Sequence, residues 1–262
     1  MSDDHEDAGA AALTAVLFDM DGVITDTAEA HAAAWKQLFD AYLAEHHPAE
    51  PPFDVDADYR EYVDGKPRQD GVQSFLESRG IELPFGSLDD DPDEPTICGL
   101  GNRKNIHFNA WLEEHRVKAY PGSVALLDRL RDAGLGVAVF SASRNATAVL
   151  ESAGVLDRFD VKVDGEDMAA LGLPGKPDPA IMRRAAELLG VEPTRAAVVE
   201  DAVAGIRAGV EGGFAQTIGV DRGGAAAGLA RAGADFVVTD LGELFLDDRG
   251  RLEARPAAAA RA

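Results

Sequence analysis

The sequence predicts an α/β fold with a doubly wound parallel sheet as its core and a second, mostly helical domain inserted after the first strand. Short β-branched apolar runs recur along the chain, and most lack polar alternation, which is typical of parallel strands covered on both faces. Helical segments separate these runs, and such alternation implies right-handed crossovers. Residues 28–119 interrupt this rhythm, which indicates the insertion.

The strands of the core are expected at residues 15–19, 136–141, 160–163, 196–201, 215–220 and 236–239. Helices are expected between them at residues 124–133, 177–189, 202–209 and 224–232. The first of these helices has apolar residues at helical spacing and stops before Gly134. The second has Pro177 in its first turn and ends before Gly190, as helices commonly begin and end.

The inserted domain begins with an amphipathic helix, because its apolar residues recur at the spacing i, i+3, i+4, i+7 and i+8. These residues are Trp35, Leu38, Phe39, Tyr42 and Leu43. Asp26, with Glu29 three residues later, resembles a capping box at the start of this helix. Further helices are expected at residues 72–76 and 106–112, and the acid- and proline-rich residues 83–95, here called the acidic loop, are expected to form a loop.

These patterns divide the chain into a core, an insertion and two tails. The core is expected at residues 13–27 and 120–246, the helical domain at 28–119, and tails at 1–12 and 247–262. A length of 262 residues fits one large domain or two smaller ones.

Composition excludes several classes of protein. The 47 acidic and 25 basic residues give a net charge of −22, and no basic patch interrupts it, so nucleic-acid and anionic-membrane partners are not expected. Cys98 is the only cysteine, which excludes an intramolecular disulfide. No apolar run approaches the roughly 18 residues of a membrane span, and residues 1–9 do not resemble a secretion signal. A cytoplasmic protein is therefore expected.

The first strand carries the strongest chemical signal. It ends in Asp19, and Asp21 follows beside a glycine that permits a sharp turn. Ligands of parallel α/β sheets bind at the carboxyl ends of the strands. Two carboxylates this close can hold a hard divalent cation, and one can serve in proton transfer. Taken alone, this fragment could instead be two carboxylates that only cap turns and bind no cation.

Three other predicted strand ends carry polar residues. One is followed by hydroxyl, backbone and cationic donors suited to phosphate: Ser141, Ala142, Ser143, Arg144 and Asn145. Lys176 precedes a helix, where its charge adds to the positive end of the helix dipole. Glu200 and Asp201 close another strand and offer acids for a metal. Singly, each fragment could be a turn or a solvated acid pair, but four in chain order indicate one site.

These motifs resemble the haloacid-dehalogenase-like superfamily of phosphotransferases over residues 14–245. Within it, the chain looks most like the β-phosphoglucomutase family. Residues 18–29, with His31 and Trp35, match that family's opening stretch, and residues 141–145 match its phosphate loop, with Arg144 where lysine is expected. In the inserted domain, which is a cap in this family, residues 65–70 resemble the segment whose arginine grips the non-reacting phosphate, and residues 102–105 resemble a second segment that faces substrate.

The resemblance implies a Rossmann-like core, a helical cap and Mg²⁺-dependent phosphoryl transfer. Asp19 would form an aspartyl phosphate, and Asp21 would act as general acid and base. Mg²⁺ would be held by the Asp19 carboxylate, the Asp21 backbone carbonyl and Asp201, with Glu200 adjacent. The remaining phosphoryl charge would be neutralised by Ser141, the Ala142 N–H and Lys176.

The implied reaction interconverts β-glucose 1-phosphate and glucose 6-phosphate through a 1,6-bisphosphate that reorients between two transfers. Its distal phosphate needs a second, partly cationic grip, and the candidates are Arg68, Ser143, Arg144 and Asn145, with Lys66, Lys104 and His31 as further contacts. For the two lysines the alternative is a solvated cation at a helix end, and for His31 a partly buried, hydrogen-bonded histidine. A monomer or weak oligomer is expected.

Two other functions stay open at this point. A Mg²⁺-dependent sugar-phosphate phosphatase would use the same core motifs with water as the acceptor, so only the cap distinguishes it from the mutase. A phospho-receiver module also gathers acids, a hydroxyl and a lysine on a parallel sheet. Receiver domains are typically shorter and lack a helical insertion after the first strand.

Overall fold

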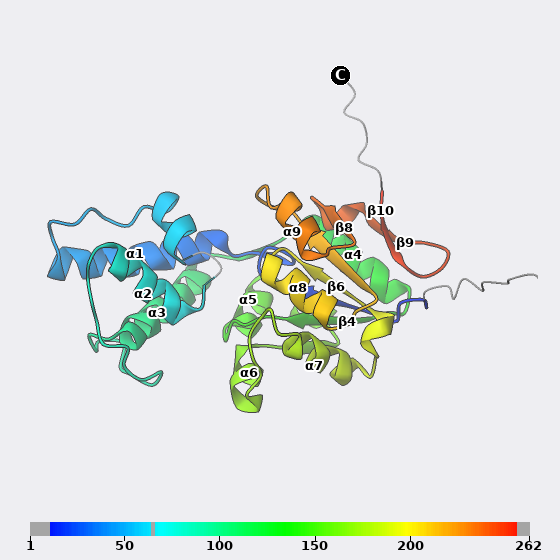
Figure 1. Ribbon diagram of the computed structural model, residues 1–262, viewed down its shortest axis with the longest axis horizontal. Helices are drawn as coiled ribbons and strands as arrows, with labels where there is room; N and C mark the ends of the chain where they lie inside the picture. Colours follow the sequence, from blue (N-terminus) through cyan, green and yellow to red (C-terminus); the bar gives the residue numbers. More distant parts are fainter. Residues whose placement is uncertain (1–10, 64–65, 256–262) are drawn as a thin grey trace, which may run out of the picture. The chain divides into compact units, whose positions relative to one another are not determined.

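The computed structural model describes residues 11–63 and 66–255. These form two compact units, one made of the described residues up to Asp26 and from Lys118 onward, the other of Thr27–Val117 (Figure 1). Within the described part of the chain, no helix combines the length and the apolar character that a membrane span requires.

The first unit is built on a six-stranded parallel sheet, which confirms the predicted doubly wound, Rossmann-like core. Its strands are β1 (Ala15–Asp19), β4 (Gly136–Phe140), β5 (Val161–Val163), β6 (Ala196–Glu200), β7 (Gln216–Val220) and β8 (Phe236–Val238). They lie in the order β5-β4-β1-β6-β7-β8. The direction of strand succession therefore reverses between β1 and β6, and the crevice at such a point is where doubly wound sheets bind ligands.

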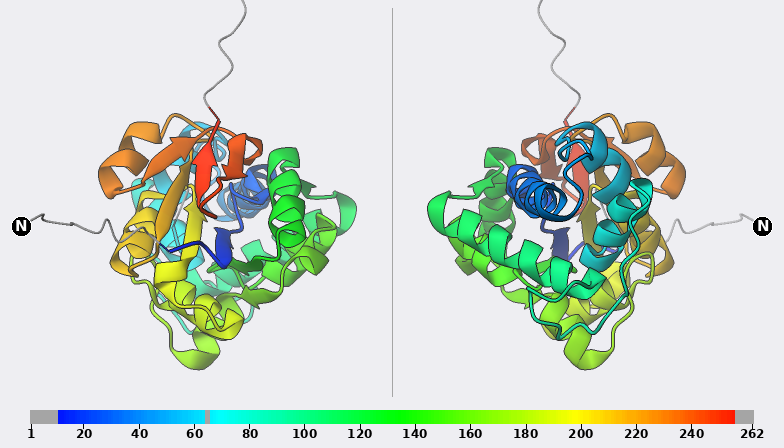
Figure 2. Two further views of the ribbon diagram at one scale, coloured as in Figure 1. Left: turned by 90° about the vertical axis from the view of Figure 1, so that its right-hand side faces the viewer. Right: turned by 90° about the vertical axis from the view of Figure 1, so that its left-hand side faces the viewer.

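Helices cover this sheet on both sides, as the two views of Figure 2 show. The helices are α4 (Pro121–Asp132), α5 (Ala146–Ser152), α6 (Gly165–Leu171), α7 (Ala180–Leu189), α8 (Val203–Glu211) and α9 (Ala226–Ala232). On one face, Ile181 and Met182 of α7 pack in the cluster that contains Leu17 of β1 and Val198 of β6. All residues of β1 and β6 are buried, which explains why both sequences are apolar up to the acid that ends each strand.

Some boundaries differ from those predicted. Helix α7 begins at Ala180 rather than 177, because the Asp178 carboxylate accepts the Ala180 N–H and holds a turn there. Helices α5 and α6 were not predicted; α6 begins with a capping box between Asp164 and Asp167. Short 3₁₀ turns lie at Leu156–Arg158, Pro193–Arg195 and Leu241–Glu243.

The expectation of a tail from residue 247 is wrong for part of that stretch. Strand β10 (Leu252–Ala254) pairs antiparallel with β9 (Leu244–Leu246). The Gln216 side chain donates to the Leu252 carbonyl and accepts its N–H, and Leu252 is fully buried. Residues 1–10 and 256–262, which were also expected in tails, lie outside the described residues.

The second unit is helical. It contains α1 (Ala28–His46), the π-helical turn Tyr59–Val63, α2 (Arg68–Ser78) and α3 (Ile97–Glu114), while the acidic loop contains no helix or strand. The amphipathic helix is confirmed, since all five apolar residues named for it are buried. The Asp26–Glu29 capping box is wrong, because Asp26 lies in β2 (Thr25–Asp26), which pairs with β3 (Lys118–Ala119), and Thr27 is the N-cap of α1.

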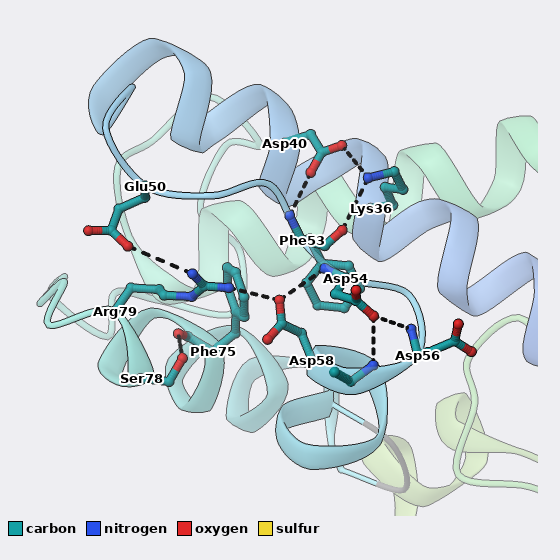
Figure 3. A network of polar contacts seen from close by, with 11 residues as sticks. Lys36, Asp40, Glu50, Phe53, Asp54, Asp56, Asp58, Phe75, Ser78 and Arg79 are labelled. Atoms are coloured by element: carbon teal, nitrogen blue, oxygen red, sulfur yellow. Dashed lines mark hydrogen bonds and ion pairs between the residues drawn. The ribbon is translucent and has the colours of Figure 1, made fainter.

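A polar network fixes the connection between α1 and the π-helical turn (Figure 3). Asp40 of α1 accepts the Phe53 N–H at 2.8 Å, and the Lys36 ammonium donates to the Phe53 carbonyl at 3.1 Å. Arg79, at the end of α2, pairs with Asp58 at 2.8 Å and with Glu50 at 3.7 Å. The connection is thereby bound to α1 and to the end of α2.

Candidate active site

The end of β1 delivers a buried carboxylate to the carboxyl edge of the sheet. Asp19 is its last residue and is only 6% exposed. The chain then turns tightly: the Met20 carbonyl accepts the Thr25 N–H, and the Gly22 N–H donates to the Thr25 carbonyl. The buried Ser123 hydroxyl of α4 fixes this turn by donating to the Val23 carbonyl at 2.6 Å. The turn that carries Asp21 is therefore bound on both sides.

Lys176 connects the end of β1 to the end of β6. Its ammonium lies 2.8 Å from Asp19 Oδ1 and 2.5 Å from Glu200 Oε1. Burial alone would lower the pKa of Lys176, but the carboxylates of Asp19 and Glu200 raise it above its ordinary value. Lys176 is thus a permanent cation at the tip of β1, predicted from its position before a helix.

The end of β6 brings two more acids to the same place. Glu200 is fully buried, and its second oxygen accepts the Ala202 N–H at 3.0 Å. Its carboxylate is pressed against Gly205 of α8, where a Cβ would lie 2.0 Å from Oε1. Asp19, Glu200 and Asp201 each offer a carboxylate oxygen, and these oxygens lie within 4.8 Å of one another. This all-oxygen cluster, here called the acid cluster, fits a hard divalent cation.

The electrostatics of the acid cluster favour a bound cation. Burial, followed by the neighbouring Glu200 carboxylate, raises the pKa of Asp201 to about 7. Burial also raises the pKa of Asp19 well above its ordinary value, although the Lys176 ammonium opposes this shift. One lysine therefore does not balance these carboxylates, and a divalent cation would stabilise their charged forms.

Asp21 lies beside the acid cluster, but its carboxylate is not one of the three grouped oxygens. It is partly exposed, and its backbone forms a bridge with Thr25. Its charge contributes to the raised pKa of both Asp19 and Asp201, so its carboxylate acts at close range. A partly exposed acid next to a buried carboxylate is a candidate for proton transfer.

The predicted phosphate loop follows β4, the strand paired with β1, in register with Asp19 opposite Phe140. Ser141 is buried, and its hydroxyl accepts the Ser143 N–H at 3.1 Å. The Ser143 hydroxyl in turn accepts the Asn145 N–H at 3.1 Å. Helix α6 closes against this loop, because a Cβ on its first residue, Gly165, would lie 2.4 Å from the Ala142 carbonyl. Ala142 and Arg144 are exposed.

The remaining predicted residues lie in the second unit. Lys66 is exposed and donates to the Ser74 hydroxyl at 2.6 Å. Lys104 is only 5% exposed, so it is not a solvated helix-end cation. Its ammonium donates to His31 Nδ1 at 2.8 Å and lies 4.7 Å from the centre of the Phe108 ring. Burial and the Lys104 charge hold the pKa of His31 well below its ordinary value.

Arg68 is the first residue of α2, and its guanidinium donates to the Asn102 side-chain oxygen at 3.3 Å. Gly65, which the sequence grouped with Arg68, lies outside the described residues. The structure therefore brings the predicted core residues together at the ends of β1, β4 and β6. In the second unit it pairs His31 with Lys104, and Arg68 with Asn102.

Arg222, which follows β7, was not among the predicted residues. It donates to the Gly22 carbonyl and to the Thr239 carbonyl, both at 3.0 Å. Its guanidinium also lies 3.8 Å from the centre of the Tyr120 ring. The rule that ligands and site residues follow parallel strand ends could have singled out Arg222, because it stands two residues beyond the last residue of β7.

Known proteins resemble this chain over most of its length. A family model described as haloacid dehalogenase-like hydrolase matches residues 13–213. A β-phosphoglucomutase of Mycobacterium bovis is 52% identical over 239 residues, which cover 88% of this chain and 91% of that protein. A β-phosphoglucomutase of Bacillus subtilis is 34% identical over 90% of this chain and 93% of its own. The crystal structure of a β-phosphoglucomutase from Clostridium difficile is similar with a TM-score of 0.68 and 28% identity, covering 88% of this chain and 92% of that one.

Proposed function

The chain belongs to the haloacid dehalogenase-like hydrolase family, and we propose that it is a β-phosphoglucomutase that interconverts β-glucose 1-phosphate and glucose 6-phosphate. The observation that carries this proposal is the buried Asp19 carboxylate, 2.8 Å from the Lys176 ammonium and grouped with Glu200 and Asp201. Covalent phosphoryl transfer needs such a carboxylate, held among positive charge that lets it approach an anion. The similarity to β-phosphoglucomutases over 88% of the chain supports this choice of reaction.

In the transfer to the protein, an Asp19 oxygen attacks the 1-phosphate of the 1,6-bisphosphate, the bond from phosphorus to the sugar oxygen breaks, and glucose 6-phosphate leaves. In the other transfer, the 6-hydroxyl of β-glucose 1-phosphate attacks the aspartyl phosphate, which forms the 1,6-bisphosphate and restores the Asp19 carboxylate. Asp21 donates a proton to the leaving sugar oxygen and later accepts one from the incoming hydroxyl. Lys176, the Ser141 hydroxyl and the Ala142 N–H bind the equatorial phosphoryl oxygens, which carry the charge of the transition state. Splitting the reaction at an aspartyl phosphate replaces one difficult transfer by two easier ones.

The acid cluster fits Mg²⁺, which prefers oxygen ligands. We assign the Asp19 and Asp201 carboxylates and the Asp21 backbone carbonyl as its protein ligands, with Glu200 adjacent. Bound Mg²⁺ would supply positive charge that reduces the repulsion between the Asp19 carboxylate and a phosphate. Glu200 holds Lys176 in place, because one of its oxygens accepts from the ammonium while the other accepts the Ala202 N–H.

A mutase must also hold the phosphate that does not react. We propose that Arg68 binds it, because a guanidinium can contact a phosphate with two parallel hydrogen bonds. Ser143, Arg144 and Asn145 of the phosphate loop are further candidates. Arg144 keeps the positive charge of the expected lysine but changes the geometry of its contacts.

Three further residues of the cap are proposed substrate contacts: Lys66, Lys104 and His31. The buried ammonium of Lys104, held by neutral His31, favours a role for this pair over a solvated surface charge. A sugar phosphate is the proposed substrate class, and we infer a cytoplasmic enzyme that is monomeric or weakly associating.

An assay with β-glucose 1-phosphate, Mg²⁺ and a priming amount of glucose 1,6-bisphosphate tests the proposal. The mutase predicts glucose 6-phosphate as the main product, with little free phosphate. Rapid phosphate release without isomerised sugar would instead identify a sugar-phosphate phosphatase. A phosphorylated Asp19 that persists for hours without any turnover of sugar would identify a phospho-receiver.

A further inference from the structure

The acidic loop and Arg68 are joined by one side chain, that of Asn102 on α3. Its amide nitrogen donates to two loop carbonyls, those of Leu88 at 3.0 Å and Asp90 at 2.9 Å. Its amide oxygen accepts from the Arg68 guanidinium at 3.3 Å. Because two carbonyls can only accept hydrogen bonds, they fix which end of the amide faces them and turn its oxygen toward Arg68.

The two carbonyls are themselves held in place. The Asp90 carboxylate accepts the Ser87 N–H at 3.0 Å and the Thr96 hydroxyl at 2.6 Å. Farther along the loop, Arg103 donates to the Pro92 carbonyl at 2.9 Å and pairs with Asp93 at 2.8 Å. The acidic loop is thus hydrogen-bonded to the first turns of α3, and two of its carbonyls support the Asn102 amide.

Arg68 is also positioned along its stem. A Cβ on Gly101 would lie 3.5 Å from Arg68 Cγ, so the arginine stem packs over the backbone next to Asn102. A side-chain amide at this point orients the guanidinium and leaves its full charge for an anion. A carboxylate of the same size would form an ion pair with Arg68 and compete with phosphate for it.

We propose that Asn102 is a positioning residue that presents Arg68 to the non-reacting phosphate of the substrate, with the acidic loop as its support. This inference rests on the proposed function, in which Arg68 binds that phosphate. It also gives a role to residues 83–95, which have no other part in the mechanism.

The test compares Asn102→Asp with Asn109→Asp, the same chemical change on the same helix, in two assays. In the isomerisation of β-glucose 1-phosphate, Asn102→Asp should raise KM by about tenfold. This is the effect expected when one hydrogen bond between the Arg68 guanidinium and the phosphate is weakened. Hydrolysis of p-nitrophenyl phosphate, which has no second phosphate, should change less than about twofold. Asn109→Asp should leave both reactions unchanged, and thermal unfolding establishes that each variant is folded.

A double-mutant cycle with Arg68→Ala tests whether Asn102 acts through Arg68. In the Arg68→Ala background, Asn102→Asp should have almost no further effect on KM, since the residue it positions is absent. Additive effects of the two changes would overturn the proposal. If Asn102→Asp does not fold, Asn102→Ala takes its place in the same cycle, with the same expectation.

The outcomes also separate this inference from the proposed function. If the wild-type protein isomerises the sugar and Asn102→Asp behaves like Asn109→Asp, only the role of Asn102 is overturned. Equal losses in both reactions would show a merely structural role and would also overturn it. If the wild-type protein hydrolyses p-nitrophenyl phosphate but isomerises no hexose phosphate, the proposed function itself fails and this inference fails with it.

Discussion

Gly22 lies directly against the carboxylate of Asp201: a Cβ on Gly22 would fall 1.8 Å from Oδ2. Gly22 also has a φ of +75°, which side chains rarely adopt. The turn after β1 and Asp201 at the end of β6 can therefore lie this close only because residue 22 has no side chain. The chemistry of the site depends on this contact, because it sets where Asp21 and Asp201 stand.

Gly22→Ala should therefore lower isomerisation by about 100-fold or more, because displacing a catalytic group by an ångström has effects of that size. Gly134→Ala is the matched control, since Gly134 has a φ of +78° and a Cβ there would meet nothing within 4 Å. The control should lose about 1 kcal/mol of stability from backbone strain and keep its activity. Steady-state rates and urea unfolding of both variants check this, and similar activities in the two would contradict it.

Asp201 should make the metal-free protein sensitive to pH. The pKa of its carboxyl is raised from 3.8 to about 7 on folding, so between these values the folded state holds more protons than the unfolded state. Stability of the metal-free protein should therefore fall as pH rises through this window. Metal binding displaces the proton, so Mg²⁺ should bind more weakly below about pH 7.

Asp201→Asn provides the test of that pH dependence. The substitution should raise the stability of metal-free protein near pH 8 by on the order of 2 kcal/mol, because it removes a repelled carboxylate. It should also weaken Mg²⁺ binding at every pH. Thermal unfolding with Mg²⁺ and with a chelator measures both effects, and a wild-type pH profile in Asp201→Asn would contradict the assignment.

Much of the core and its site could be predicted because each strand and the acid at its end can be recognised within one short segment of sequence. Strands β1 and β6 are covered on both faces, so their sequences are apolar up to the acid at the end of each strand. Their neighbouring positions in the sheet then bring Asp19 close to Glu200 and Asp201. Knowledge of the strand ends was therefore enough to assemble the acid cluster.

Contacts between distant segments could not be predicted in this way. Arg222 contacts the Gly22 carbonyl across 200 residues of chain, and no local pattern reports that pairing. Strand β10 lies in a charged stretch whose composition is typical of a tail. Its position depends on the hydrogen bonds between its Leu252 backbone and the Gln216 side chain of β7. The orientation of the Asn102 amide likewise depends on loop carbonyls whose positions only the folded chain defines.

Arg222 should stabilise the turn that carries Asp21. Arg222→Leu removes two hydrogen bonds to backbone carbonyls and the contact with the Tyr120 ring, which should cost about 1–3 kcal/mol of stability. The rate should also fall, because the Gly22 carbonyl loses its donor. Urea unfolding measures the first effect, and the exposed Arg207→Ala, expected within about 0.5 kcal/mol of wild type, is the control. Equal stabilities would contradict this role.

His31 should make the second unit sensitive to acid. Its pKa is held well below 6.5 in the folded protein, so below about pH 6.5 the unfolded state binds the additional proton. Stability should therefore fall as pH drops below that value, and His31→Gln, which stays neutral, should reduce this slope. Urea unfolding at several pH values checks the prediction. An unchanged slope in His31→Gln would show that His31 is not the group responsible.

The most direct test of the account is the identification of the phosphorylated residue. Protein mixed with glucose 1,6-bisphosphate and Mg²⁺, quenched in acid, and analysed by peptide mass spectrometry should carry a phosphoryl group on Asp19. Asp19→Asn should carry none and should not isomerise sugar, because its amide cannot serve as the nucleophile. A phosphoryl group on another residue, or substantial isomerisation by Asp19→Asn, would contradict the account.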